Sequence, residues 1–278
     1  MNFKYKVISI ACFIHAFTLG AAEDLRSQNL IDSLLGSLGK SPLVHIYNEH
    51  VQMYISKLYK EILLLGDEQA SEEYQKLGKE AQQSAGILEN WHVPIKKINP
   101  ASTVASFVGA LAEADAIYVN EERLALRSYG ARRCALFHEA VHEKYHDLAF
   151  DSILEWGSLI SASIISHKLI KSVSPFNKFC LSGMVHKGGA FVLGVIASSL
   201  VSSKFSYYRE RRADLEGHYG TACYKCVEES AAFARHRNEV EKNPLIHNGY
   251  LWPLELEEIA ADLHQENKTC NYHREINA

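Results

Sequence analysis

The pentapeptide 138–142, with the sequence H-E-A-V-H, constrains the fold most strongly, because its side chains can cooperate only on a helix. Helix positions i and i+4 lie above one another on the same face. His138 and His142 would then direct two imidazoles at one point, at the ~2.0–2.1 Å from a shared ion that zinc requires. Glu139 lies about 100° around the helix from His138, where its carboxylate reaches a water molecule at the ion without becoming a ligand. The pattern predicts a helix that holds a metal on one face.

The residues before this motif favour the helix. The run 131–137 contains neither Gly nor Pro, and Gly130 stands at the expected helix start. Cys134 lies one turn before His138, and we interpret it as a small buried side chain rather than a ligand or a nucleophile. The alternative is a solvent-exposed helix rich in His, since the chain contains 14 histidines. A third ligand decides between the two interpretations.

Two carboxylates downstream supply that ligand. Glu210 and Asp214 are spaced i, i+4 and share one helix face. A catalytic zinc site needs three protein ligands and an open fourth position. Glu210 can be the third ligand, and Asp214 can accept the other ring N–H of a ligating His. The alternative is a solvated helix in which both carboxylates pair with neighbouring arginines, at positions 209, 211 and 212.

The combined pattern H-E-x-x-H at 138–142 and E-x-x-A-D at 210–214 resembles the M48 family of zinc metallopeptidases. This gluzincin family includes the HtpX-type membrane proteases and the CAAX-prenyl proteases. Asp147 matches an acidic position of HtpX-like members, and residues 116–120 resemble the strand that precedes the zinc helix. The basic stretch 127–133 departs from the family pattern, which carries acidic residues there.

The resemblance implies a mainly α fold with a small β-sheet (α+β). This fold would be a zincin-like metalloprotease domain with the H-E-x-x-H helix and a downstream E-x-x-A-D helix. We assign this domain to residues 91–265, after a signal peptide at 1–22 and a helical N-terminal region at 23–90. Residues 266–278 are assigned as a C-terminal tail.

The expected activity is that of a zinc metalloendopeptidase with one Zn²⁺ per chain, acting on protein or peptide substrates in extracytoplasmic quality control or processing. Glu139 would be the general base. A developing oxyanion also needs a protein donor, for which family alignment favours His247, with Tyr250, Arg237 and His236 as alternatives. Two His and one carboxylate also bind Co²⁺, Mn²⁺ or Fe²⁺. Rival functions are a zinc amidase for cell-wall peptides and a catalytically idle chaperone or scaffold.

The N-terminus has the layout of a secretory signal peptide. Lys4 and Lys6 precede an apolar stretch, and small residues 20–22 precede Glu23. We therefore expect export to the periplasm or another extracytoplasmic space, with an uncleaved anchor as the alternative. The net charge of −4 argues against a nucleic-acid partner.

Five cysteines remain after the signal peptide, and their odd number leaves at least one unpaired. The pair Cys223-x-x-Cys226 fits a local disulfide, a redox pair or half of a zinc knuckle. The chain has no second C-x-x-C, which argues against a structural zinc site there.

The remaining chain predicts helices and a small sheet. Residues 67–85 are polar and helix-prone, and we expect an exposed arm or hairpin. Residues 91–98 and 117–119 predict strands, while 104–111 fits a strand or a helix. An extended peptide could add to the open edge of such a sheet.

Two apolar segments, 153–165 and 190–201, separate the metal motifs. Each is shorter than the ~20 residues of a membrane span, which favours two buried core helices. A hairpin associated with a membrane is the alternative, as the HtpX resemblance implies.

Overall fold

The computed structural model describes residues 60, 63–105, 108–113, 115–147, 164–165, 168, 181–241 and 250–276. The chain divides into two compact units, 1–35 with 150–206 and 36–149 with 207–278. The signal peptide, most of the apolar segment 153–165 and His247 lie outside the described residues.

The elements in chain order are α5 (Glu72–Ser84), the 3-10 helix η2 (Glu89–Trp91), β1 (Ile95–Lys97), β2 (Ala110–Glu113), β3 (Ala116–Val119), α6 (Glu121–Ala125), α7 (Tyr129–Tyr145), α9 (Leu181–Gly220), α10 (Tyr224–Glu241), α11 (Pro253–Gln265) and α12 (Asn271–Ile276).

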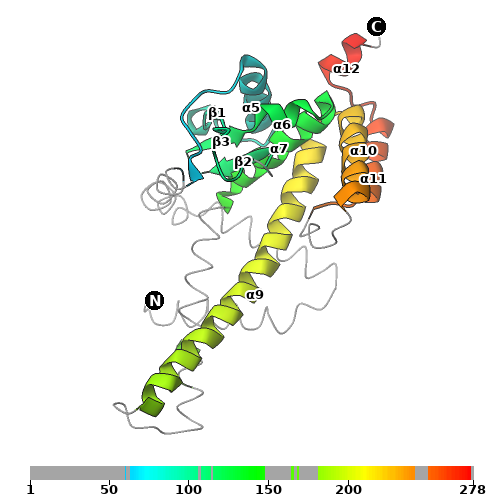
Figure 1. Ribbon diagram of the computed structural model, residues 1–278. Helices are drawn as coiled ribbons and strands as arrows, with labels where there is room; N and C mark the ends of the chain where they lie inside the picture. Colours follow the sequence, from blue (N-terminus) through cyan, green and yellow to red (C-terminus); the bar gives the residue numbers. More distant parts are fainter. Residues whose placement is uncertain are drawn as a thin grey trace. The chain divides into compact units, whose positions relative to one another are not determined.

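The described structure is mainly helical with one three-stranded sheet, which confirms the predicted α+β class at this level (Figure 1). The strand order is β1-β3-β2. The central strand β3 pairs in parallel with β1 and antiparallel with β2. All four residues of β3 are fully buried, which explains their continuous apolar sequence. Strand β2 is therefore an edge of this sheet.

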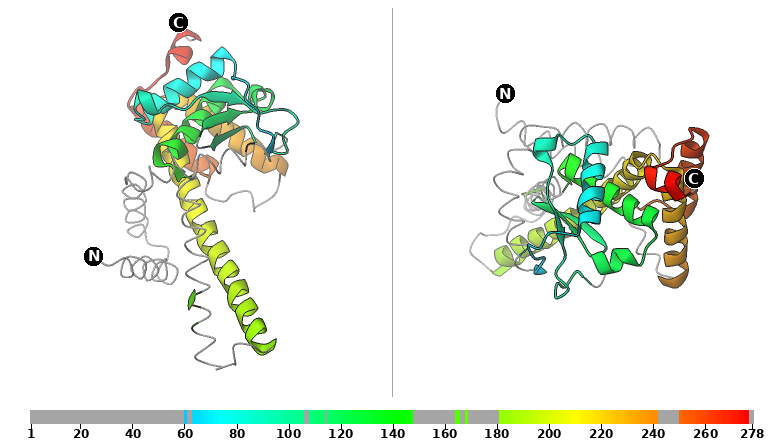
Figure 2. Two further views of the ribbon diagram at one scale, coloured as in Figure 1. Left: turned by 90° about the vertical axis from the view of Figure 1, so that its left-hand side faces the viewer. Right: turned by 90° about the horizontal axis from the view of Figure 1, so that it is seen from above.

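Helix α5 packs against α7 and β1, so the predicted exposed arm at 67–85 is wrong (Figures 1 and 2). Its Tyr74, Leu77 and Ala81 belong to the core that includes β1, β3 and α7. A Cβ on Gly78 would lie 2.3 Å from Ile95 Cδ1, which shows how closely α5 approaches β1. Apolar side chains at helical spacing thus decided the position of a segment whose average composition is polar.

Both ends of α7 are defined by local sequence. The Ser128 hydroxyl accepts a hydrogen bond from Ala131 N and caps the first turn. His146 ends the helix in the left-handed conformation, with φ of 50°. The predicted helix through residues 138–142 is therefore present and extends over 17 residues.

Helices α10 and α11 run side by side and share a second core with Cys134 of α7 (Figures 1 and 2). Helix α11 begins at Pro253, and the Glu255 carboxylate accepts a hydrogen bond from Trp252 N. The predicted tail at 266–278 contains α12, whose His273 is buried. This segment thus contributes to the folded unit.

Among the described residues, no helix combines the length and the apolar character needed to cross a membrane. The segment 190–201 lies within α9.

Candidate metal centre

Helices α7 and α9 bring the three predicted ligands together. His138 Nε2 lies 3.0 Å from His142 Nε2 and 3.3 Å from Glu210 Oε2. His142 Nε2 lies 3.6 Å from Glu210 Oε1. Donor atoms placed tetrahedrally at ~2.0–2.1 Å from zinc are about 3.3–3.4 Å apart. The three side chains therefore have the spacing that one metal ion requires.

Each imidazole is oriented by a buried carboxylate on its other nitrogen. Asp214 Oδ1 lies 2.7 Å from His138 Nδ1, as the i, i+4 spacing predicted. Asp147 Oδ2 lies 2.8 Å from His142 Nδ1, a role that the sequence analysis did not assign. Such partners fix the tautomer and raise the basicity of metal-binding His. The signal for Asp147 was its position five residues after His142, just past the helix end.

The carboxylates of Asp214 and Asp147 have further hydrogen-bond and ion-pair partners. Asp214 Oδ2 accepts a hydrogen bond of 2.8 Å from Leu251 N. Arg212 forms a buried ion pair with Asp147, and Arg209 Nη1 lies 3.3 Å from the Asp147 carbonyl oxygen. Glu210 and Asp214 form ion pairs with His138 and His142, whereas Arg211 pairs with Glu255 and Arg212 with Asp147, which argues against the alternative in which these arginines neutralise the two carboxylates.

The carboxylates of the site keep their negative charge. Burial raises the pKa of Glu210, but hydrogen bonds to His138 and His142 outweigh it and hold the pKa far below its usual range. Burial likewise raises the pKa of Asp214, but the charge and hydrogen bond of His138 bring it below its usual value. Without a metal these carboxylates pair with the imidazoles, whose protons a divalent cation would replace.

Glu139 lies beside the ligands and faces the sheet edge. Its Oε2 accepts a hydrogen bond of 2.8 Å from Ala112 N on β2. The Ala112 amide therefore points away from β3 and toward α7.

Tyr250 is the described residue best placed to donate a hydrogen bond at the centre. Its ring stacks on His138, with centroids 5.6 Å apart. Burial, followed by the charges of nearby carboxylates and a hydrogen bond to Glu210, raises the pKa of its hydroxyl, which therefore stays protonated. Arg237 lies 5.8 Å from the Tyr250 ring centroid, and His236 is exposed. Tyr250 thus fits the donor role better than the other described alternatives.

Close packing of α9 on α7 sets the distance between the ligands. A Cβ on Gly217 would lie 2.8 Å from His138 N and 2.9 Å from its Cα. The backbone of His138 cannot move aside as the end of a flexible side chain can. Any larger residue at position 217 would therefore push α9 and α7 apart.

We therefore expect Gly217→Ala to destabilise the fold by about 1–3 kcal/mol and to lower the metal occupancy of the centre. Urea unfolding and metal analysis measure the two effects. Gly189→Ala in the same helix is the matched control, because no described atom lies within 4 Å of its added Cβ. Equal stability of the two variants would contradict the close approach.

A second group of potential ligands comprises Cys223, Cys226, Cys270 and His273. The lack of a second C-x-x-C argued against a zinc site at this C-x-x-C. The missed signal is the C-x-x-H at 270–273, which supplies the same number of ligands. No disulfide joins these cysteines or the buried Cys134.

Comparisons with models of protein families, with curated proteins and with solved structures found no match to this chain. The chemistry of the site must therefore be argued from its own residues.

Proposed function

We propose that this protein is a zinc-dependent metalloendopeptidase that hydrolyses peptide bonds of protein substrates, with a zincin-like, M48-like catalytic domain. The observation that carries the proposal is the convergence of His138, His142 and Glu210 on one point, with Glu139 beside them. Metal sites that serve only structure are closed by four protein ligands, whereas three ligands leave a position for a reactant.

The donor set fits zinc. Imidazole nitrogen and carboxylate oxygen are established zinc ligands, and the distances between the donor atoms match tetrahedral geometry. When bound, zinc supplies a Lewis acid that polarises a carbonyl group and activates water near neutral pH. The carboxylates of Asp214 and Asp147 keep the two imidazoles in the tautomer that presents Nε2 to the ion.

The residues of the chain supply proton transfer and charge stabilisation. Glu139 accepts the proton of the attacking water on its carboxylate and delivers it to the leaving amine. The Tyr250 hydroxyl donates a hydrogen bond to the carbonyl oxygen of the substrate as negative charge develops there. His247, the first candidate for this role, lies outside the described residues.

The edge strand supports a peptide as the substrate. Strand β2 pairs with β3 on one side, and its Ala112 amide points toward Glu139 on the other. An extended peptide can add to such an edge through main-chain hydrogen bonds, which would bring a peptide bond past the metal ligands. Recognition through the main chain is suited to protein substrates of varied sequence. The N-terminal segment 1–22 is the sole basis for expecting export, and hence a role in extracytoplasmic quality control or processing.

The ligand set is tested by the metal content of Glu210→Ala. Removing one of three ligands should lower zinc binding at this centre by several orders of magnitude, since the two remaining imidazoles make an incomplete site. Equilibrium zinc titration of the full chain measures the affinity, and hydrolysis of an unfolded protein such as casein measures activity. Glu228→Ala, an exposed carboxylate on α10, is the control and should change neither.

Unchanged zinc affinity in Glu210→Ala would overturn the ligand assignment. A zinc-loaded wild type that cleaves cell-wall peptides but no protein would favour the amidase, and one that cleaves neither would favour a scaffold.

A further inference from the structure

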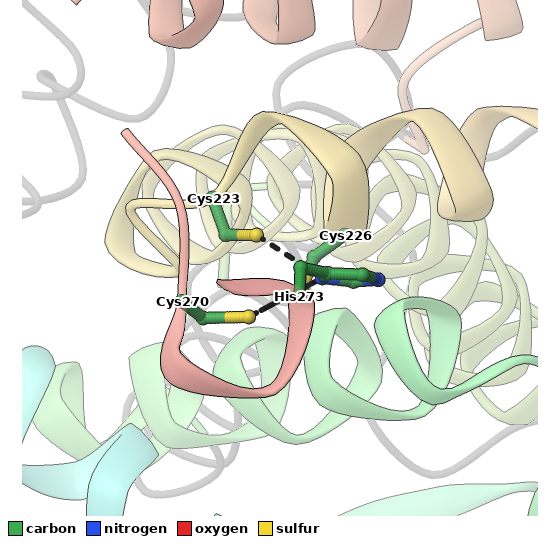
Figure 3. A group of neighbouring side chains, drawn as sticks. All are labelled: Cys223, Cys226, Cys270 and His273. Carbon is green, nitrogen blue, oxygen red and sulfur yellow. Dashed lines mark hydrogen bonds between the residues drawn. The ribbon is translucent and has the colours of Figure 1, made fainter. Parts of the chain in front are cut away.

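The second ligand group joins two distant segments of the chain. Cys223 and Cys226 lie at the start of α10, while Cys270 and His273 lie at the start of α12, 44 positions after Cys226. Figure 3 shows that the three thiols and the imidazole point toward one another between these two helices. One donor atom from each residue lies within 4.8 Å of all the others.

The distances are those of a tetrahedral metal site. The Sγ atoms of Cys226 and Cys270 are 3.7 Å apart. His273 Nδ1 lies between 3.3 and 3.6 Å from the three sulfur atoms. Around zinc, with Zn–S of ~2.3 Å and Zn–N of ~2.0–2.1 Å, tetrahedral geometry gives about 3.8 Å between sulfurs and about 3.5 Å from sulfur to nitrogen.

We propose that Cys223, Cys226, Cys270 and His273 form a structural zinc site. The Cys₃His set is complete at four ligands, so it has no open position for a substrate. It shares no residue with the His138 centre, and it does not depend on the peptidase function. The protein would therefore carry two zinc ions per chain with separate roles.

The imidazole is oriented for this purpose. His273 Nε2 lies 2.8 Å from Glu229 Oε1, which leaves Nδ1 facing the sulfurs. The other oxygen, Glu229 Oε2, accepts a hydrogen bond of 2.7 Å from Gly130 N in the first turn of α7. A carboxylate on the second ring nitrogen is the usual support of a zinc-binding His.

A positively charged side chain lies beside the proposed thiolates. Three thiolates and Zn²⁺ together carry one negative charge, which a buried site must compensate. The buried Arg133 guanidinium, which also pairs with Glu80, lies next to the thiolates, with Nη1 3.7 Å from Cys226 Sγ. A neighbouring guanidinium stabilises thiolates.

The site would hold α12 against α10 and α7. Helix α12 has six residues, which is too short to be stable by itself. Metal ligation would hold it to α10, and Glu229 would link the site to the helix that carries His138 and His142. Tyr272, between the two α12 ligands, stacks on Tyr129 of α7 with ring centroids 3.8 Å apart.

Cobalt substitution of the full chain tests the proposal, because a thiolate-bound Co²⁺ gives a strong sulfur-to-metal charge-transfer band that a His₂Glu site cannot give. Reduced, metal-free wild type should bind two Co²⁺ per chain and show the band. Glu210→Ala should bind one and keep the band, whereas the triple variant Cys223→Ser, Cys226→Ser and Cys270→Ser, which removes every assigned thiolate, should bind one and lose the band. Cys134→Ala is the matched control, since this buried thiol lies in the same core but outside the ligand group.

Absence of the band in reduced wild type would overturn the proposal without requiring any variant to fold. A band that persists in the triple variant would overturn the assigned ligands. Mass spectrometry of protein purified without reductant provides a second check: zinc bound to free thiols supports the site, and a Cys226–Cys270 disulfide without metal contradicts it. Loss of peptidase activity alone bears on the other centre only.

Discussion

Glu139→Gln is expected to reduce peptide hydrolysis by about 10²–10⁴-fold, which is the usual contribution of a general base. The amide keeps the size of the side chain but cannot accept a proton from water. Zinc should remain bound, because Glu139 is not one of the three residues whose donor atoms converge. Steady-state kinetics on a fluorogenic peptide, combined with metal analysis, measures both quantities in the same preparation.

The pattern of the kinetic change is as informative as its size. Because the lost step is proton transfer, kcat should fall while KM stays close to the wild-type value. Glu122→Gln makes the same chemical change on the exposed face of α6 and should leave kcat unaltered. Full activity in zinc-loaded Glu139→Gln would exclude Glu139 as the base and with it the proposed mechanism.

Arg212→Met is expected to destabilise the fold by about 3–5 kcal/mol, since it removes the guanidinium partner of the buried Asp147 carboxylate and leaves it only the hydrogen bond to His142. Arg212 and Asp147 are 7% and 3% exposed and pair with each other. Arg212 also lies over the Tyr145 ring, 3.9 Å from its centroid, and methionine cannot replace that cation–π contact. Urea unfolding in excess chelator measures the change without a contribution from bound metal.

An exposed ion pair provides the control for this prediction. Arg235 pairs with Glu257 at the surface, so Arg235→Met should cost less than about 1 kcal/mol. The double variant Arg212→Met with Asp147→Asn should recover part of the lost stability, because no buried charge is then left unpaired. If the double variant is no more stable than Arg212→Met, the loss arises from packing rather than from the stranded carboxylate.

The three residues of the candidate metal centre could be predicted because their geometry is local. An i, i+4 spacing places two side chains on one helix face wherever that helix lies, so His138 with His142, and Glu210 with Asp214, were paired correctly from spacing alone. Only the meeting of the two pairs needed tertiary structure. His138 and Asp214 are 76 positions apart, and the glycine at 217 permits the close approach that joins them.

The errors have a common physical origin. The segment 67–85 was expected to be exposed because of its average polarity, although its few apolar residues lie on one face and fill the core. The four-residue Cys₃His group was missed because its halves lie 44 positions apart and only one half resembles a familiar motif.

The sequence by itself determined which residues form the candidate metal centre, because helical periodicity fixes the neighbours of a side chain within one turn. The tertiary structure alone decided which residues support them. Asp147, Arg212 and Tyr250 reach the centre through the packing of separate elements, and that packing depends on the shape and burial of whole helix faces rather than on any local pattern.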